Sequence, residues 1–262
     1  MFIIGELING MYEHIGKAIK ERDKSVIQKC ALEQVWAGSD ALDINCGPAS
    51  KKPIEDMPWL VETVQEVTDK PLVLDSSKPQ VIAAGLAAAK NKLIINSTTA
   101  EQGKIDVLLP LAKQYDAKLI GLTISAKGIP QNKEQRLELA AAIVAACSEY
   151  EFPIENLYLD PIVLPVNVAQ AQMKDILDSI NEFKIISEPP PKTIVGLSNV
   201  SQGACSRSLI NRTFLVMAAA YGLDAAILDP LDKELMDALI SAELVLNKQI
   251  YCDSYLEAYR KK

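Results

Sequence analysis

The sequence predicts an α/β protein of the (β/α)8 class, a TIM barrel, as one domain over residues 1–262. Eight short aliphatic or β-branched runs alternate with segments of helical periodicity along the whole chain. The runs are apolar almost without a break, which is typical of parallel strands buried on both faces. A length of 262 residues suits one barrel, and no linker interrupts the alternation.

The first half of the alternation supplies four pairs of a strand and a helix. A strand over 2–7 precedes helical spacing over 12–37, and a strand over 41–45 precedes a helix over 57–68. A strand over 71–75 leads to a helix over 79–90, and a strand over 93–96 leads to a helix over 102–115. In each pair the strand is followed by apolar residues with the period of a helix.

The second half repeats this order with strands over 118–123, 157–160, 193–197 and 225–229. The helices that follow them are expected over 133–150, 169–187, 206–221 and 231–248. Eight alternations favour closure into a barrel, and the main alternative is a doubly wound open sheet. No GxGxxG or GxxxxGK[ST] motif stands at a strand-helix junction, so the nucleotide sites common in open sheets are not indicated.

Charge and composition exclude several classes of protein. A formal net charge of -7 argues against a general nucleic-acid binder, which needs a basic face to contact phosphates. The amino terminus lacks the features of a secretory signal, and no apolar stretch is long enough to cross a bilayer. We therefore expect a cytoplasmic protein with neither nucleic acid nor membrane among its partners.

Cysteine and histidine usage narrows the chemistry further. The one histidine, His14, excludes a zinc site built on imidazole and makes a catalytic triad improbable. The cysteines never form a CxxC pair, so we expect reduced thiols that are mostly in the core. The tryptophans and two helix residues, Phe214 and Met217, are also expected in the core or in helix packing. The aromatic and cysteine positions concerned are Trp36, Trp59, Cys30, Cys46, Cys147, Cys205 and Cys252.

Hydrogen-bonding side chains stand at the end of nearly every predicted strand, where a barrel has its substrate loops. Two other uses of such residues stay open, namely capping of the following helices and coordination of a divalent metal. Capping explains the set less well, because several members directly terminate apolar runs. Without His or Lys, such a set suits a neutral heterocycle rich in N–H groups. Its members are Glu6, Asn9, Asp43, Asn45, Asp75, Asn96, Thr123, Asp160, Ser198, Asn199 and Asp229.

Short motifs at these strand ends resemble those of the pterin-binding barrels. The motifs are 3–9 (IIGELIN), 74–76 (LDS), 95–98 (INST), 121–123 (GLT), 159–161 (LDP) and 196–201 (GLSNVS). Each is weak alone, but their order on successive strands is specific. The pterin-binding barrels include dihydropteroate synthase and the folate domain of cobalamin-dependent methionine synthase. Among them the chain is most similar to the methyltetrahydrofolate:corrinoid/iron-sulfur protein methyltransferases.

This resemblance implies a single pterin-binding domain and assigns roles to individual residues. Asn199 is the implied catalytic residue, placed near the ring nitrogen that carries the methyl group. The pterin is held by three residues from earlier strands, and the last loop and helix start supply the rest of the substrate-binding set. The implied substrate-binding residues are Asp75, Asn96, Asp160, Ser198, Gln202 and Arg207. No metal site is implied.

The activity implied by the resemblance is transfer of the methyl group of 5-methyltetrahydrofolate to the Co(I) centre of a corrinoid/iron-sulfur protein. This is a step of the reductive acetyl-CoA (Wood-Ljungdahl) pathway. Methyltetrahydrofolate is the methyl donor, the corrinoid is carried by the partner protein, and this chain holds no tightly bound cofactor. A homodimer is also implied, with 209–223 and 235–246 as candidate contacts that core packing explains equally well.

Three other functions compete with this one. A dihydropteroate synthase shares the pterin site but needs cations for a pyrophosphate leaving group, and the seventh strand ends in Leu197, Ser198 and Asn199 instead. A methyltransferase with another corrinoid partner, or a methionine synthase domain, is the second alternative. A noncatalytic folate-binding protein is the third.

Overall fold

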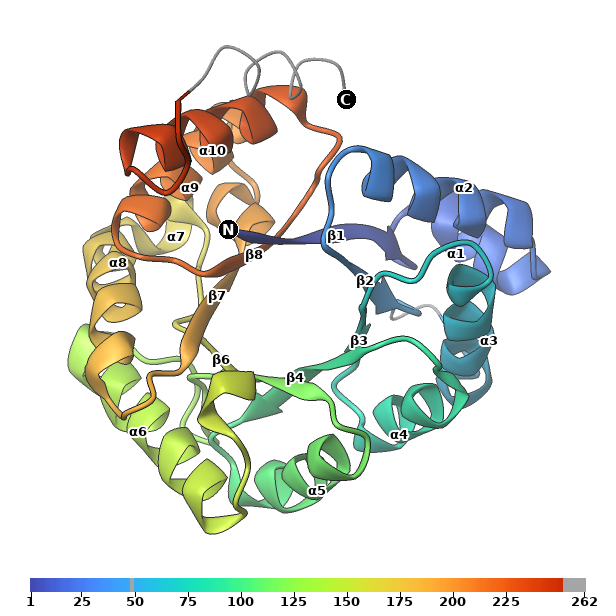
Figure 1. Ribbon diagram of the computed structural model, residues 1–262, viewed down its shortest axis with the longest axis horizontal. Coiled ribbons are helices and arrows are strands. Elements are labelled where there is room, and N and C mark those ends of the chain that lie inside the picture. The colour runs from blue at the N-terminus through green and yellow to red at the C-terminus, as the bar shows by residue number, and fades with distance from the viewer. Residues whose placement is uncertain (48–49, 252–262) are drawn as a thin grey trace.

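The computed structural model describes residues 1–47 and 50–251 and shows a closed barrel of eight parallel strands. The strands follow one another around the barrel in chain order, and β1 pairs with both β2 and β8. This confirms the (β/α)8 class, and Figure 1 shows the helices as a ring around the strands. The strands are β1 (Phe2–Asn9), β2 (Ala41–Asn45), β3 (Leu72–Asp75), β4 (Leu93–Thr99), β5 (Lys118–Leu122), β6 (Leu157–Asp160), β7 (Lys192–Gly196) and β8 (Ala225–Leu228).

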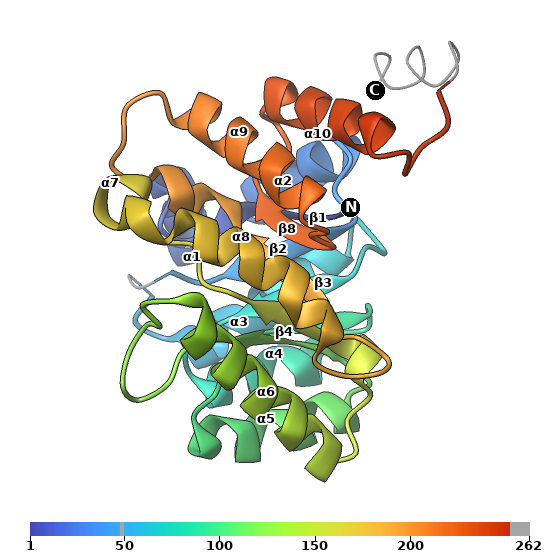
Figure 2. The same ribbon diagram turned by 90° about the vertical axis from the view of Figure 1, so that its left-hand side faces the viewer.

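Ten α-helices and four short 3-10 helices are found in the described residues. The α-helices are α1 (Glu13–Glu21), α2 (Lys24–Trp36), α3 (Pro53–Gln65), α4 (Pro79–Ala88), α5 (Gln102–Gln114), α6 (Lys133–Glu149), α7 (Val166–Ala169), α8 (Met173–Glu182), α9 (Arg207–Ala220) and α10 (Lys233–Val245). The 3-10 helices are η1 (Ile154–Asn156), η2 (Gln170–Gln172), η3 (Phe183–Ile185) and η4 (Leu197–Ser201). Figure 2 shows α9 and α10 side by side.

Two predicted helices are divided in the structure. The helix expected over 12–37 is α1 and α2, because Arg22 adopts a left-handed conformation with φ of 57°. Asp23 then caps α2 by accepting a hydrogen bond from the Ser25 N–H at 3.0 Å. The helix expected over 169–187 is α8, flanked by η2 and η3, and the helix expected from 57 begins earlier, at Pro53. Apolar spacing alone does not reveal breaks in a helix that keep the same buried face.

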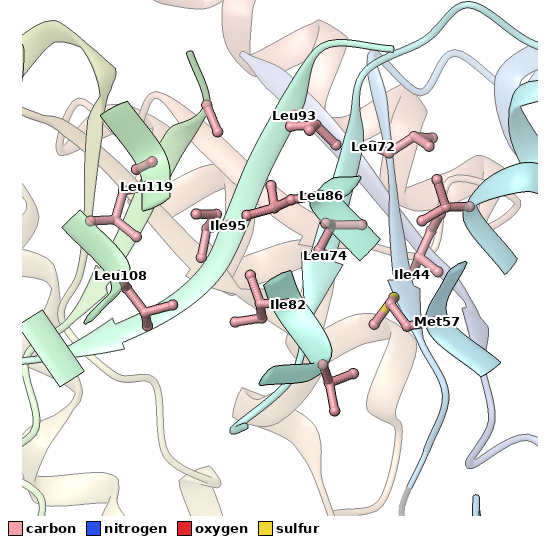
Figure 3. Close-up of a cluster of buried hydrophobic side chains, with 14 of the residues drawn as sticks. Ile44, Met57, Leu72, Leu74, Ile82, Leu86, Leu93, Ile95, Leu108 and Leu119 are labelled. Carbon is pink, nitrogen blue, oxygen red and sulfur yellow. The ribbon is translucent and has the colours of Figure 1, made fainter. Parts of the chain in front are cut away.

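The core lies in two shells on either side of the strands. Outward-facing side chains of β2 to β5 pack against α3, α4 and α5, as Leu74, Ile82 and Leu108 illustrate in Figure 3. Inside the barrel a separate apolar layer closes the lumen. This layer consists of Ile4, Ala41, Val73, Ile94, Ile120, Tyr158, Ile194 and Ala225.

Some of the side chains expected in the core lie at the surface. Trp36 at the end of α2 is 66% exposed and Met217 on α9 is 46% exposed, so both predictions were wrong. Phe214 is buried, and Trp59 is partly buried against the core. Three cysteines are buried and Cys205 is exposed, while Cys252 lies outside the described residues. Whether a position on a helix faces the core depends on how neighbouring helices cover it, which composition does not specify.

Among residues 1–47 and 50–251, every helix is too short or too polar to cross a membrane.

Candidate active site

A cavity of about 390 Å³ lies at the carboxyl ends of the barrel strands. All eight strands contribute to its lining, as expected for a substrate site in this fold. Its polar lining residues are Glu6, Asn9, Asp43, Asp75, Asn96, Ser97, Asp160, Ser198 and Asn199. Its apolar lining residues are Leu122, Ile124, Ile162, Val163, Gly196 and Ile227.

The two-residue period of the strands builds this cavity directly above the apolar layer inside the barrel. On β3, Val73 belongs to the apolar layer and Asp75, two residues later, lines the cavity. On β6, Tyr158 and Asp160 stand in the same relation. The same step separates Ile4 from Glu6, Ala41 from Asp43, Ile94 from Asn96, and Ile194 from Gly196.

Two strand irregularities add further side chains to the site. Between Asn96 and Thr98 the register of β4 shifts against β5, so that Ser97 is an extra residue and lines the cavity together with Asn96. A second register shift, of β1 against β2, lies between Gly5 and Ile8, and this interval contains Glu6. Bulges of this kind turn a strand locally and re-aim its side chains, which is why they occur beside active sites.

Asp43 and Asp75 form the most crowded acidic part of the cavity. The Asn45 side-chain amide donates to Asp75 at 2.6 Å, and the Asn96 amide donates to Asp43 at 3.2 Å. Burial, followed by the negative charge of Asp75, raises the pKa of Asp43 well above its usual range. Burial also raises the pKa of Asp75 to about 6, against the opposing effect of the Asn45 hydrogen bond. The pair thus prefers a ligand that donates hydrogen bonds or carries a proton.

Asp160 lies on the other side of the lumen at the end of β6. Burial raises its pKa to about 7, although backbone N–H groups of Ile162 and Gly196 favour the charged form. The Ile162 N–H donates to the Asp160 carboxylate at 2.7 Å, which fixes the start of the following loop. Asp160 therefore combines one anchored oxygen with a position on the cavity wall.

The loop after Asp160 is held from behind by Arg136 of α6, which is fully buried. Its Nε donates to the Pro161 carbonyl at 2.8 Å, and Nη2 donates to the Gln172 side chain at 2.8 Å. Its Nη1 has no hydrogen-bond partner, and no carboxylate of the described residues forms a salt bridge with it. Burial lowers the pKa of the guanidinium. Arg136 thus ties both ends of the loop 161–172 to the barrel wall.

Replacing Arg136 with Ala is expected to lower the free energy of unfolding by roughly 2–4 kcal/mol. The change leaves a cavity and removes the donors to Pro161 and Gln172. Urea denaturation followed by circular dichroism measures it. Lys29→Ala is the control, because this side chain is 76% exposed and its loss should change stability by less than about 0.5 kcal/mol. Equal stability of the two variants would show that Arg136 does not hold the loop.

Ser198 and Asn199 enter the site from η4, directly after β7. The Ser198 hydroxyl donates to Glu6 at 2.6 Å, while burial raises the pKa of Glu6. The Asn199 amide nitrogen lies over Gly196, only 3.0 Å from where a Cβ on that residue would stand. The absence of a side chain at position 196 therefore makes room for the Asn199 amide in the cavity.

The remaining two predicted binding residues do not line the cavity. Gln202 and Arg207 are both exposed. The Arg207 Nε donates to the Ser201 hydroxyl at 3.2 Å, and its Nη2 donates to the Ser198 carbonyl at 3.4 Å. Arg207 thus braces the turn that carries Ser198 and Asn199, and its charge lowers the pKa of Glu6 against the larger effect of burial.

Helix capping does not explain the predicted site residues. In the described residues the side chains that cap α-helices are Asp23, Asn132 and Asp232. Asp75 instead accepts a hydrogen bond from Asn45, and Asn96 donates one to Asp43. Asp160 accepts one from the Ile162 N–H in the adjoining loop. As for the metal alternative, no group of three or more His, Cys, Asp or Glu suited to an ion is found in the part of the chain that the structure describes.

Sequence reasoning included Glu6 and Asp43 in the strand-end ring but did not select them as binding residues. Both line the cavity, and alternation from the apolar residues Ile4 and Ala41 identifies them once the barrel interior is known. Ser97 depends on the bulge, which leaves no mark in the sequence. Asp229, a member of the same ring, instead accepts a hydrogen bond from the Leu231 N–H at 2.8 Å.

A barrel with a buried acidic and amide-lined cavity at its strand ends defines a binding site for a small ligand rich in hydrogen-bond donors. The model of the pterin binding enzyme family matches residues 14–229, and the chain therefore belongs to this family. This confirms the resemblance that the strand-end motifs indicated.

Among curated proteins, the methylcorrinoid:tetrahydrofolate methyltransferase of Eubacterium limosum is 30% identical over 263 residues, covering 100% of this chain and 97% of that protein. Methionine synthase of Mycobacterium leprae is 27% identical over 215 residues, which is 76% of this chain but only 18% of that enzyme. The chain is thus matched along its whole length by one relative and corresponds to a part of the other.

Solved structures of dihydropteroate synthases share the fold. The Yersinia pestis enzyme with a pterine-sulfa conjugate has a TM-score of 0.69 at 17% identity, with 94% of each chain covered. The Coxiella burnetii enzyme with pteroic acid has a TM-score of 0.71 at 14% identity, covering 93% of this chain and 92% of that one. At these identities the likeness shows the fold alone.

Proposed function

We propose that this protein is a methyltransferase that exchanges a methyl group between N5 of tetrahydrofolate and the cobalt of a protein-bound corrinoid. The observation that carries the proposal is the strand-end cavity, which is lined by four carboxylates and by amides. The full-length relative named as a methylcorrinoid:tetrahydrofolate methyltransferase supports the same chemistry.

The lining of the cavity favours methyl transfer over condensation by a dihydropteroate synthase. A condensing enzyme must stabilise a departing pyrophosphate, which calls for cationic side chains close to the ligand. The lining residues of the strand-end cavity include no Lys or Arg among the described residues, and Arg207 is occupied by the η4 turn. A pyrophosphate ester would instead meet Glu6, Asp43, Asp75 and Asp160.

In the proposed complex the pterin lies across the strand ends. Asp160 accepts hydrogen bonds from the amino group and an adjacent ring N–H, while Asp75 and Asn96 contact the other edge. Asn199 donates to N5, where the methyl group is bound, and Ser198 orients Glu6 beside it. Gln202 and Arg207 remain candidates for contacts to the part of the folate outside the cavity.

The transfer step needs positive character on N5, because an amine anion is a poor leaving group. Co(I) donates an electron pair to the methyl carbon, the bond from carbon to N5 breaks, and N5 gains a proton supplied by solvent water. The products are tetrahydrofolate and methyl-Co(III), so charge and atoms balance. Asn199 stabilises the developing charge through a hydrogen bond, and the carboxylates favour a protonated pterin electrostatically. Cobalt is the nucleophile, so none is required from the protein.

Direction and partner are the finer parts of the proposal. We propose a corrinoid/iron-sulfur protein of the reductive acetyl-CoA pathway as partner and methyl transfer from methyltetrahydrofolate to Co(I), as the strand-end motifs imply. The Eubacterium relative is named for transfer in the opposite direction. One site serves both directions, since forward and reverse reactions share a transition state.

A homodimer stays a prediction. In its favour, an apolar groove of about 380 Å³ runs between α9 and α10, the region expected to form contacts. Val216 and Val245 line it and are exposed, whereas Phe214 and Leu239 of the same helices are in the core.

The test is a spectroscopic assay that mixes the protein, methyltetrahydrofolate and a reduced corrinoid protein. Loss of the Co(I) absorption with formation of methyl-cobalt is the expected result, and methyl-corrinoid with tetrahydrofolate should show the reverse. Binding of methyltetrahydrofolate without any methyl transfer would establish a noncatalytic folate-binding protein instead. Condensation of the pterin pyrophosphate with p-aminobenzoate would establish a dihydropteroate synthase.

A further inference from the structure

A second cavity, of about 610 Å³, adjoins the candidate active site on the side of α1. It lies between the β1–α1 loop, α1 itself and the segment 50–56 that leads into α3. We call it the α1 groove. Figure 1 shows α1 and α3 on the same side of the barrel. The volume of the α1 groove exceeds that of the strand-end cavity.

The α1 groove is cationic in a protein that is acidic as a whole. Its acidic lining residues are Glu13, Glu21 and Asp56, against five cations in a chain of net charge -7. The cations that line it are Lys17, Lys20, Arg22, Lys51 and Lys52.

Two of these cations are already used within the protein. Arg22 donates to Asp56 at 2.6 Å and stacks 4.9 Å from the centre of the Trp59 ring, and Lys52 pairs with Glu55 at 3.2 Å. Asp56 also accepts from the Ser50 hydroxyl at 2.5 Å, so its charge is satisfied from two sides. Within the described residues, Lys17, Lys20 and Lys51 form no ion pair. Their charge is available to an anionic ligand.

The α1 groove begins where the strand-end cavity ends. Asn9 lines the strand-end cavity, and Gly10 and Met11, the next residues, line the groove. The Gly10 N–H donates to the Asn45 carbonyl at 2.9 Å, and a Cβ on Gly10 would meet the Cys46 carbonyl at 2.1 Å. The β1–α1 and β2–α3 loops are therefore in backbone contact, which holds the groove beside the mouth of the barrel.

We propose that the α1 groove binds the glutamate tail of the folate substrate. The inference rests on the proposed function, because the tail belongs to the same ligand as the pterin. A folate joins a neutral pterin to carboxylates through an aminobenzoyl spacer, and γ-linked glutamates each add one negative charge. The strand-end cavity is lined by four acidic side chains and by no Lys or Arg of the described residues, so it does not attract these charges, whereas Lys17, Lys20 and Lys51 do.

Arg207 is the competing site for the tail. Its guanidinium is bound to Ser201 and to the Ser198 carbonyl, and its charge acts on Glu6. It offers one cation that is already engaged, while the groove offers three without an ion pair in the described residues. The charge distribution therefore favours the groove.

The experiment compares the dissociation constants of tetrahydrofolate with one and with three glutamates by isothermal titration calorimetry at low salt. The triglutamate should bind roughly tenfold more tightly to the wild-type protein, and this ratio should fall in 0.5 M salt. In the Lys17→Gln/Lys51→Gln variant the dissociation constants of the two ligands should agree within about twofold. Lys29→Gln is the matched control, since this exposed lysine lies on α2 outside the groove, and it should preserve the wild-type ratio.

Three results would overturn the inference. These are equal affinity of the wild-type protein for both ligands, an unchanged ratio in the double lysine variant, and loss of the ratio in Arg207→Gln with retention in the lysine variant. Failure of both folates to bind would refute the proposed function itself. Equal binding of both folates would refute only the role of the groove.

Discussion

Asn199→Ala is expected to slow methyl transfer by a factor of roughly ten to a thousand, the scale for loss of one positioned hydrogen-bond donor. The Asn199 amide lies in the cavity over Gly196 and caps no helix in the described residues. Its hydrogen bond to N5 should strengthen as charge develops, so pterin affinity should fall much less than the rate. Stopped-flow measurement of Co(I) loss gives the rate, and fluorescence titration gives the affinity.

Gly196→Ala is the matched variant for this prediction. The added methyl group would lie 3.0 Å from the Asn199 amide nitrogen and must displace it by a few tenths of an ångström. We expect a smaller decrease in rate than for Asn199→Ala, with the pterin still bound. An unchanged rate in Asn199→Ala would remove this residue from the mechanism and leave N5 to be activated by other groups.

Asp160→Asn should weaken binding of tetrahydrofolate by roughly 10-fold to 100-fold, because it replaces one of the two carboxyl oxygens that accept from the ligand with an NH2 donor. The same change should stabilise the ligand-free protein above pH 7. The pKa of Asp160 is about 7 in the fold and ordinarily 3.8, so the folded state binds more protons between these values. The stability that protonation of Asp160 contributes is therefore present in full below pH 4 and is lost as pH rises through 7.

The stability lost through ionisation of Asp160 is on the order of 4 kcal/mol, because its pKa differs by about three between the folded and unfolded states. Urea denaturation between pH 4.5 and 8 measures it. The free energy of unfolding of the wild-type protein should fall as pH rises, and that of Asp160→Asn should fall less steeply. Asp75, whose pKa is about 6, retains part of the slope in the variant. A wild-type stability that rises with pH over this range would contradict a buried, partly protonated Asp160.

Much of the architecture was accessible from the sequence, because strands buried on both faces leave continuous apolar runs. Six of the eight predicted strands begin at the observed residue and end within three residues of the observed end, as β4 and β6 illustrate. The break at Arg22 was missed, since Arg rarely adopts positive φ and nothing in its type indicates it.

The site was accessible in part for the same reason. Asp75, Asn96 and Asp160 end apolar runs, and the structure brings them together with Asn199 around one cavity. Gln202 follows them closely in sequence yet lies outside that cavity, because η4 turns the chain away from the barrel axis. The cationic α1 groove was not foreseen, since its lysines come from α1 and from the segment before α3, whose proximity depends on the backbone contact at Gly10.

The layered interior of the barrel also bears on how this family diversifies. The apolar layer that closes the lumen and the polar residues above it occupy different positions of the same strands, separated by two residues. Mutations in the upper positions therefore change the ligand without reopening the lower layer, and selection can act on each layer separately. Proteins that share the barrel at 14–17% identity are a natural outcome of such independence.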